Sequence, residues 1–173
     1  FVLAACAMAS LSWATASVAQ STAARSAPCP RECLQKHLDT YLSAVAAHQP
    51  AAGNLWAGFR QTENAVVVPE GQGLWSQVTG LGSVQRRYFD PVQQQAGYYG
   101  TVRMGDEEAV VALRLRVQWN QVTEAEWFVA RKGDPGMTGE PGKTPFDLEK
   151  LRATLPAQRI VPKAERASRE LLQ

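Results

Sequence analysis

The stretch AVVALRLRVQW, residues 109–119, decides the fold class because its apolar and polar residues alternate cleanly from Val111 onward. Successive side chains of a β-strand point to opposite faces, so this alternation predicts a strand with one face on a core and the other toward solvent. Five residues are predicted on the core face: Val111, Leu113, Leu115, Val117 and Trp119.

Further strand-like runs flank this stretch. Residues 83–90 and 97–104 precede it and residues 122–131 follow it, with turn residues between the runs. Residues 59–69 contain another apolar run, in which Asn64-Ala65 predicts a hairpin turn. Because the connections are short, the runs predict a meander of antiparallel strands.

A long amphipathic helix is predicted at residues 30–48, ahead of the strands. Its apolar residues recur every three or four positions, and Pro30 suits the first turn of a helix. Shorter helical turns are predicted at residues 55–57 and 71–78. A long helix followed by a meander is an α+β order, in which a curved antiparallel sheet wraps against helices on one face.

The first 19 residues carry no charge, and residues 17–19 (SVA) resemble an A-x-A cleavage site. This pattern predicts a secretory signal with a truncated start, and a secreted or periplasmic protein. The alternative is a lipid anchor through Cys6, since residues 3–6 (LAAC) fit a lipoprotein motif. We expect no stable membrane span, because serine and threonine interrupt the apolar stretch.

The composition changes again after Lys132. Gly133, Gly136, Gly139 and Gly142 fall every third residue, but four collagen-like triplets are too few for a stable triple helix, so we expect an exposed linker. Residues 146–173 form a helical tail that we interpret as the possible start of a second module. The predicted layout is a signal peptide at 1–19, a linker at 20–28, a pocket domain at 29–132, a Gly/Pro-rich linker at 133–145 and the tail at 146–173.

Composition and motifs exclude several classes of function. The 173 residues carry a net charge of +2, which gives no concentrated basic face for a nucleic acid. The sequence has no nucleophile elbow, no phosphate-binding loop, no dinucleotide fingerprint and no H-E-x-x-H zinc motif. We therefore predict no nucleic-acid partner and no cofactor.

Cys29 and Cys33 lie at the head of the long helix. A spacing of four places both on one helical face, where they can close a short disulfide in an oxidising compartment. Free thiols and a redox or metal function are the alternatives. A metal is not expected, because two thiolates are half of a zinc ligand set and neither His37 nor His48 stands in a spacing that completes it.

Seven short motifs appear in an order that is typical of a known superfamily. They are Cys29-x-x-x-Cys33-Leu34, Asp39-x-Tyr41-Leu42, Thr62-Glu63-Asn64, Gly73-Leu74-Trp75, Phe89-Asp90-Pro91, Leu113-Arg114-Leu115 and Val122-Thr123-Glu124-Ala125-Glu126. Together they resemble the SnoaL-like proteins of the nuclear transport factor 2-like superfamily, and more specifically an exported branch of unsettled function.

The resemblance implies a cone-shaped fold with an apolar pocket between the long helix and the concave face of the sheet. It implies a small apolar or aromatic ligand, and it allows a homodimer through the outer face of the sheet. Enzymes, carriers and oligomerisation modules all use this fold, so the function has to be argued from side chains.

Proton transfer in such a pocket needs a carboxyl group whose pKa is raised by burial and a donor that stabilises an oxyanion. Glu63 and Asp90 are the candidate acid or base groups, and Tyr41 is the candidate donor. The structural alternatives are that Glu63 caps the hairpin or pairs with an arginine, and that Asp90 forms a turn before Pro91.

Five further residues are predicted to line the ligand site: Asn64, Trp75, Arg87, Tyr88 and Trp56. The leading hypothesis is a cofactor-independent isomerase, lyase or cyclase. The alternative is a non-catalytic ligand-binding or dimerisation module whose pocket is filled by its own aromatic side chains.

Overall fold

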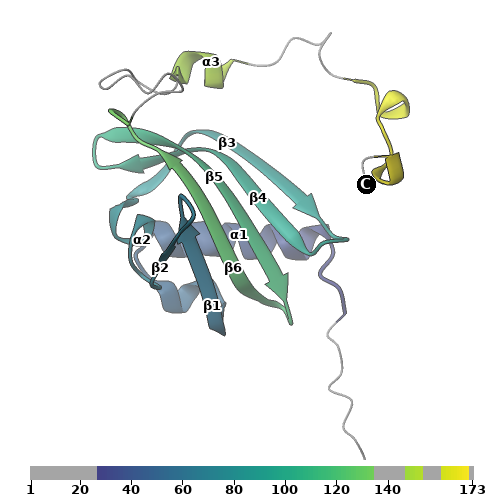
Figure 1. The fold of residues 1–173 in the computed structure, drawn as a ribbon, viewed down its shortest axis with the longest axis horizontal. Coiled ribbons are helices and arrows are strands. Elements are labelled where there is room, and N and C mark those ends of the chain that lie inside the picture. The colour runs from purple at the N-terminus through teal and green to yellow at the C-terminus, as the bar shows by residue number, and fades with distance from the viewer. Residues whose placement is uncertain (1–26, 135–146, 154–160, 172–173) are drawn as a thin grey trace, which may run out of the picture.

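The structure, a computed structural model, describes residues 27–134, 147–153 and 161–171 (Figure 1). Helix α1 (Arg31–Ala46) lies behind a curved sheet whose strands cross it diagonally. A 3-10 turn, η1 (Pro50–Gly53), follows α1 and leads into the first strand. The predicted α+β architecture, a long helix against the concave face of a curved sheet, is confirmed.

The sheet has six strands in the order β2-β1-β6-β5-β4-β3. Their bounds are β1 (Leu55–Glu63), β2 (Val66–Val68), β3 (Gly80–Asp90), β4 (Gln95–Met104), β5 (Glu107–Gln118) and β6 (Gln121–Ala130). Every pairing is antiparallel except β1 with β6, which is parallel. The expectation of a wholly antiparallel sheet is wrong at this pair, because η1 carries the chain across so that β1 enters the sheet from the end where β6 begins.

The remaining elements are short. Helix α2 (Leu74–Gln77) connects the β1–β2 hairpin to β3, and α3 (Leu148–Arg152) contacts β3 through a hydrogen bond from Arg86 to the carbonyl of Leu151 (2.8 Å). Two 3-10 turns, η3 (Lys163–Glu165) and η4 (Arg169–Leu171), lie in the tail. Residues 55–57 open β1 instead of forming the predicted helical turn, which occurs earlier, at η1.

The core lies between α1 and the concave face. From β5 it receives Val111, Leu113, Leu115 and Val117, as the alternation predicts. Trp119 was predicted with them but is 55% exposed, because the strand ends at Gln118 and Trp119 occupies the following turn. The predicted Asn64-Ala65 hairpin turn is confirmed, with positive φ at both residues.

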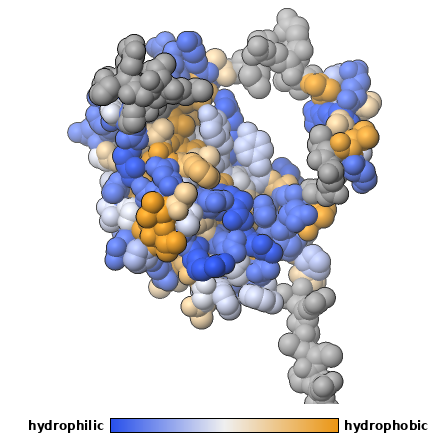
Figure 2. Space-filling model, in the orientation of Figure 1, coloured by the Kyte–Doolittle hydropathy of each residue, from blue (hydrophilic) through white to orange (hydrophobic). Residues whose placement is uncertain are grey.

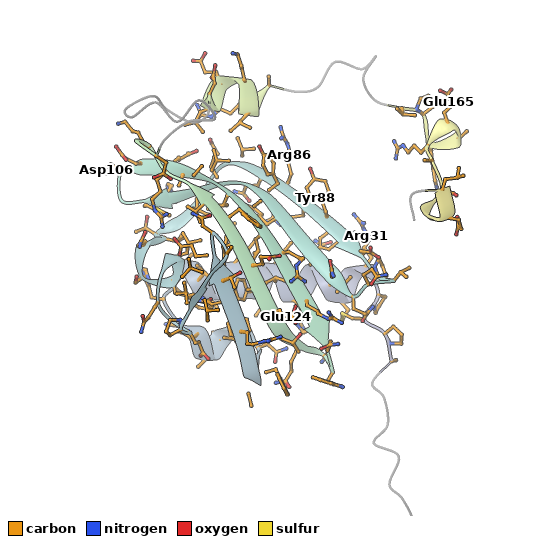
Figure 3. All side chains as sticks on the ribbon, viewed as in Figure 1. Arg31, Arg86, Tyr88, Asp106, Glu124 and Glu165 are labelled. Carbon is orange, nitrogen blue, oxygen red and sulfur yellow. A yellow bond between two sulfur atoms is a disulfide. The ribbon has the colours of Figure 1, made fainter. Side chains whose placement is uncertain are left out.

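The outer face of the sheet is a mosaic of hydrophilic and hydrophobic side chains (Figure 2). Arg114 of β5 bonds Glu124 and Glu126 of β6 there, and Tyr88 and Phe128 are 57% and 53% exposed. Arg86 and Tyr88, labelled in Figure 3, both project from β3. Within the described parts of the chain, none of the helices has the length and apolar character needed to cross a membrane.

Candidate functional site

Three aromatic side chains fill the centre of the cone. Tyr41 of α1 lies between Trp75 of α2, at 5.3 Å between ring centroids in an edge-to-face arrangement, and Trp127 of β6, at 6.2 Å. All three are fully buried. The space in which the resemblance implies a ligand is therefore occupied by the protein's own rings.

The polar atoms of this cluster bond one another. The indole N–H of Trp127 donates to the Tyr41 hydroxyl (3.2 Å), and that of Trp75 donates to Oε1 of Gln61 (2.8 Å). Burial raises the pKa of Tyr41 far above its usual range. A phenol held neutral can donate a hydrogen bond, as predicted for Tyr41. Its ring, however, packs against the indole rings of Trp75 and Trp127.

Glu63 lies at the end of β1, where it is bonded from two directions. One oxygen accepts the backbone N–H of Leu74 (3.1 Å), and the other pairs with the guanidinium of Arg131 (2.5 Å). Gly73, with a φ of 62°, leaves room for this carboxylate, since a Cβ there would lie 2.6 Å from its oxygen. Glu63 and Gly73 thus act together to fix the start of α2 against the end of β1.

Asn64 supports the same corner of the fold. Its side-chain amide donates to the carbonyl of Val129 (3.1 Å) and accepts the N–H of Val129 (2.8 Å), as a neighbouring strand would do. In this arrangement Asn64 pins the β1–β2 hairpin to β6, and both polar ends of its amide are engaged.

The other predicted site residues lie apart from this cluster. Asp90, at the end of β3, accepts the backbone N–H groups of Val92 (3.0 Å) and Gln93 (3.1 Å), which is a turn-forming role. Arg87 faces the concave side and pairs with Asp39 of α1 (2.9 Å). Tyr88 lies on the outer face. The structure therefore brings together Tyr41, Trp75 and the Glu63 corner, but not Asp90, Tyr88 or Trp56.

A second group of polar residues gathers at the opposite end of the cone, where α1 begins. The predicted disulfide between Cys29 and Cys33 is present there. Nε2 of His37, a residue only 6% exposed, lies 3.1 Å from Oδ1 of Asn120, and its Nδ1 lies 3.4 Å from Nδ2 of Asn54. The Asn54 amide also donates to the carbonyl of Asn120 (2.9 Å).

A groove of about 540 Å³ runs beside this polar group. Its lining residues are Ala27, Pro28, Cys29, Pro30, Cys33, Gln94, Val117, Gln118, Trp119 and Asn120. The Gln94 amide holds the Cys29 backbone through two hydrogen bonds, of 2.6 Å to its N–H and 3.0 Å to its carbonyl, so one wall of the groove is fixed. Trp119 extends the apolar surface by packing on Trp56, at 5.3 Å between ring centroids.

The sequence did not predict the polar group of His37, Asn54 and Asn120 or the groove beside it. His37 was placed outside any ligand set, yet its ring nitrogen and the two sulfurs of Cys29 and Cys33 all lie within 4.8 Å of one another. The available signal was the spacing, since the three residues follow one another at intervals of four. Nothing in the sequence indicated that Asn54 and Asn120, both in loops, would meet His37.

Comparison with solved structures identifies the fold. A protein of unknown function with a cystatin-like fold from Methylobium petroleophilum PM1 matches with a TM-score of 0.51 at 13% identity, over 78% of this chain and 99% of that chain. The chain shares the cystatin-like fold of that protein. This conclusion rests on that match together with the long helix and curved sheet.

Two further solved structures are similar. A candidate ketosteroid isomerase from Kribbella flavida DSM 17836 has a TM-score of 0.48 and 17% identity, over 74% of this chain and 93% of that one. A nuclear transport factor 2-like protein of unknown function from Burkholderia xenovorans LB400 has a TM-score of 0.46 and 11% identity, over 57% and 83%. No protein-family model and no curated protein matches the sequence. At these identities the comparisons establish the fold alone.

Proposed function

We propose that the protein is an exported, non-catalytic binding module that takes a small apolar or aromatic ligand in the groove at the disulfide end of its cone. The observation that carries this proposal is the filled interior. Tyr41, Trp75 and Trp127 occupy the centre, and among the described residues the buried polar side chains are His37, Gln61, Thr101 and Thr123, with no carboxylate.

The groove offers what a small aromatic ligand requires. Ligand sites are concave and mostly apolar, with a few polar groups that fix orientation. Here Trp119 and the disulfide supply apolar surface, while Asn120 and Gln94 supply amide groups. Because hydrogen bonds hold both amides in place, the polar groups are already positioned before a ligand arrives.

The backbone at Trp119 supports the same proposal. Trp119 and Asn120 have φ values of 52° and 59°, a conformation that suits asparagine and glycine but is costly for a bulky residue. A tryptophan there exposes a large ring at the tip of a hairpin. Strained residues of this kind cluster at functional sites, where the surrounding structure holds them.

Catalysis by Glu63, Asp90 and Tyr41 stays a prediction with a direct test. Each of these residues has a structural partner. Glu63 pairs with Arg131, Asp90 accepts the backbone N–H of Val92, and the Tyr41 hydroxyl accepts the indole N–H of Trp127. If the protein is an isomerase or lyase, Glu63→Gln and Asp90→Asn will abolish turnover of a substrate that the wild type converts. Turnover that survives both substitutions removes these carboxylates from any mechanism.

Binding can be tested by saturation-transfer NMR with a set of monocyclic and bicyclic aromatic compounds, starting with indole and 2-naphthol. We expect binding to weaken at least tenfold in Trp119→Gly, which removes the ring and suits the positive φ. Phe128→Ala is the matched control, because it removes an exposed ring from the outer face. Equal weakening in both variants, or retained binding in Trp119→Gly, contradicts the proposed groove.

A second candidate function is association of two copies through the outer face of the sheet. The exposed rings of Tyr88 and Phe128 on this face, beside the Arg114 ion pairs, favour it. Analytical ultracentrifugation of the wild type and of Tyr88→Ser with Phe128→Ser tests it. A dimer that the double variant converts to monomer supports association, and a monomeric wild type contradicts it.

A further inference from the structure

We propose that Cys29, Cys33 and His37 form a binding site for one thiophilic cation of the zinc type when the disulfide is reduced. The two sulfurs and a ring nitrogen of His37 already lie within 4.8 Å of one another. Thiolate and imidazole are the ligands that Zn²⁺ prefers in proteins. The site shares Cys29, Cys33 and Asn120 with the groove lining, but it does not require that the groove binds a ligand.

The start of α1 and the residue pair just before it place these three residues together. Side chains four apart lie on one face of a helix and lean toward its N-terminus. His37 therefore leans back toward Cys33, and Cys33 toward Cys29, whose Cα is 5.3 Å from that of Cys33. The first turns of α1 hold Cys33 and His37, while Cys29 precedes the helix and is held by the Gln94 amide.

Asn120 supplies the fourth donor of a tetrahedral set. Its Oδ1 lies 3.1 Å from Nε2 of His37 and 3.8 Å from Sγ of Cys33, so it already sits between two of the proposed ligands. Structural zinc sites use four ligands drawn from cysteine, histidine and carboxylate groups, so an amide oxygen makes this a weaker site than those. The turn that holds Asn120 is fixed by the hairpin between β5 and β6, which brings this oxygen to α1 from a distant part of the sequence.

Asn54 is placed to support the metal-bound form of His37. In the disulfide form, Nδ1 faces the Asn54 amide nitrogen, so Nε2 carries the proton that is donated to Asn120. Metal binding through Nε2 requires the proton at Nδ1 instead. Rotation of the Asn54 amide would present its oxygen as the acceptor, which is the arrangement that commonly orients a metal-bound histidine.

The charge and electron balance of the two states is simple. A phosphine reductant and one water molecule supply two electrons and two protons, which convert the disulfide to two thiols and leave the phosphine oxide. Each thiol then loses its proton to solvent as its sulfur bonds the cation, because the thiolate is the metal ligand. Two thiolates neutralise one divalent cation, so a site with Cys29 and His37 this deeply buried holds no uncompensated charge.

The test is a titration of the full chain with Zn²⁺ after reduction with a phosphine, beside the oxidised protein. We expect one Zn²⁺ per reduced chain, release of about two protons at neutral pH, a rise in melting temperature and no binding to the oxidised chain. Co²⁺ in place of Zn²⁺ should give a thiolate-to-cobalt charge-transfer band. A reduced, folded chain that binds no Zn²⁺ overturns the proposal, as does equal binding to the oxidised chain.

Variants separate this site from adventitious thiol binding. His37→Gln should weaken Zn²⁺ binding at least tenfold, and Asn120→Gly, which keeps the positive φ of the turn, should weaken it less. The control is His48→Gln, because His48 bonds the Trp75 carbonyl at the other end of α1. Circular dichroism of each oxidised variant confirms folding. If His37→Gln and Asn120→Gly both fold and both bind like the wild type, the proposed ligand set is wrong.

Discussion

The interior of the cone and its disulfide end differ in what their side chains do for one another. In the interior, Tyr41, Trp75 and Trp127 pack ring against ring and bond their own polar atoms. At the disulfide end, His37 and Asn120 sit beside a groove and an exposed indole. In the interior, side chains satisfy one another, whereas the disulfide end combines a polar group with an open groove.

The largest effect should come from the interior. Trp127→Ala removes a fully buried ring and should lower the free energy of unfolding by about 3 to 5 kcal/mol, since the packed cluster cannot collapse into the cavity. Urea denaturation followed by circular dichroism measures it. The adjacent Phe128→Ala, on the opposite face of β6, should change stability by no more than about 0.5 kcal/mol.

This pair of neighbours tests the comparison directly. A loss at Trp127 as small as that at Phe128 would mean that the interior tolerates an opening and could accept a ligand. In that case the cone interior, and with it the catalytic hypothesis for Tyr41, would regain support.

The disulfide should matter less for stability than the interior. Cys29→Ser with Cys33→Ser removes a crosslink that closes a loop with a sequence separation of four, and chain entropy assigns such a short loop about 2 kcal/mol. Urea denaturation of the double variant, compared with the oxidised wild type, measures the loss. A cost as large as that of Trp127→Ala would show that the disulfide end is part of the core and not a separate functional region.

Alkaline pH probes the interior through Tyr98. Burial raises the pKa of Tyr98 to about 12, with the Glu108 carboxylate adding to the rise and Arg87 opposing it. The hydroxyl proton is shared between the carbonyls of Thr101 (2.8 Å) and Val84 (3.2 Å). The unfolded chain loses this proton near pH 10, so its stabilising contribution is present below about pH 10 and is lost as the pH rises toward 12.

Tyr98→Phe isolates this contribution. The variant should lose about 1 kcal/mol at pH 8 through the missing hydrogen bonds. It should then lose less than the wild type between pH 8 and pH 11, as followed by urea denaturation at each pH. Parallel losses in the two proteins would show that Tyr98 does not titrate on unfolding and that the region around it is open to water.

The sequence predicted the regular parts of this molecule well because their periods are local. Alternation from Val111 to Val117 set the face of β5, and the apolar period of residues 30–48 located α1. The parallel pairing of β1 with β6 could not be predicted this way, because it depends on the path through η1 and joins segments far apart in the chain.

The candidate sites were harder to predict for the same reason. Glu63 was predicted as an acid or base, but its partner Arg131 lies just after β6, and no local pattern links the two. Trp119 continued the alternation of β5, so only the turn itself, with its positive φ, revealed that the ring leaves the core. Contacts made by loops depend on the completed fold, and the apolar periodicity of helices and strands does not predict them.

A stability change as small as that of Phe128→Ala is expected at Trp119, although its effect on binding should be large. Glycine relieves the positive φ, a gain of about 1 kcal/mol, while loss of the contact with Trp56 costs a similar amount. Trp119→Gly should therefore unfold within about 0.5 kcal/mol of the wild type in urea and still lose affinity for aromatic ligands. A loss of stability comparable to that of Trp127→Ala would show that Trp119 belongs to the core. The distinction between a packed interior and an open groove would then be wrong at Trp119.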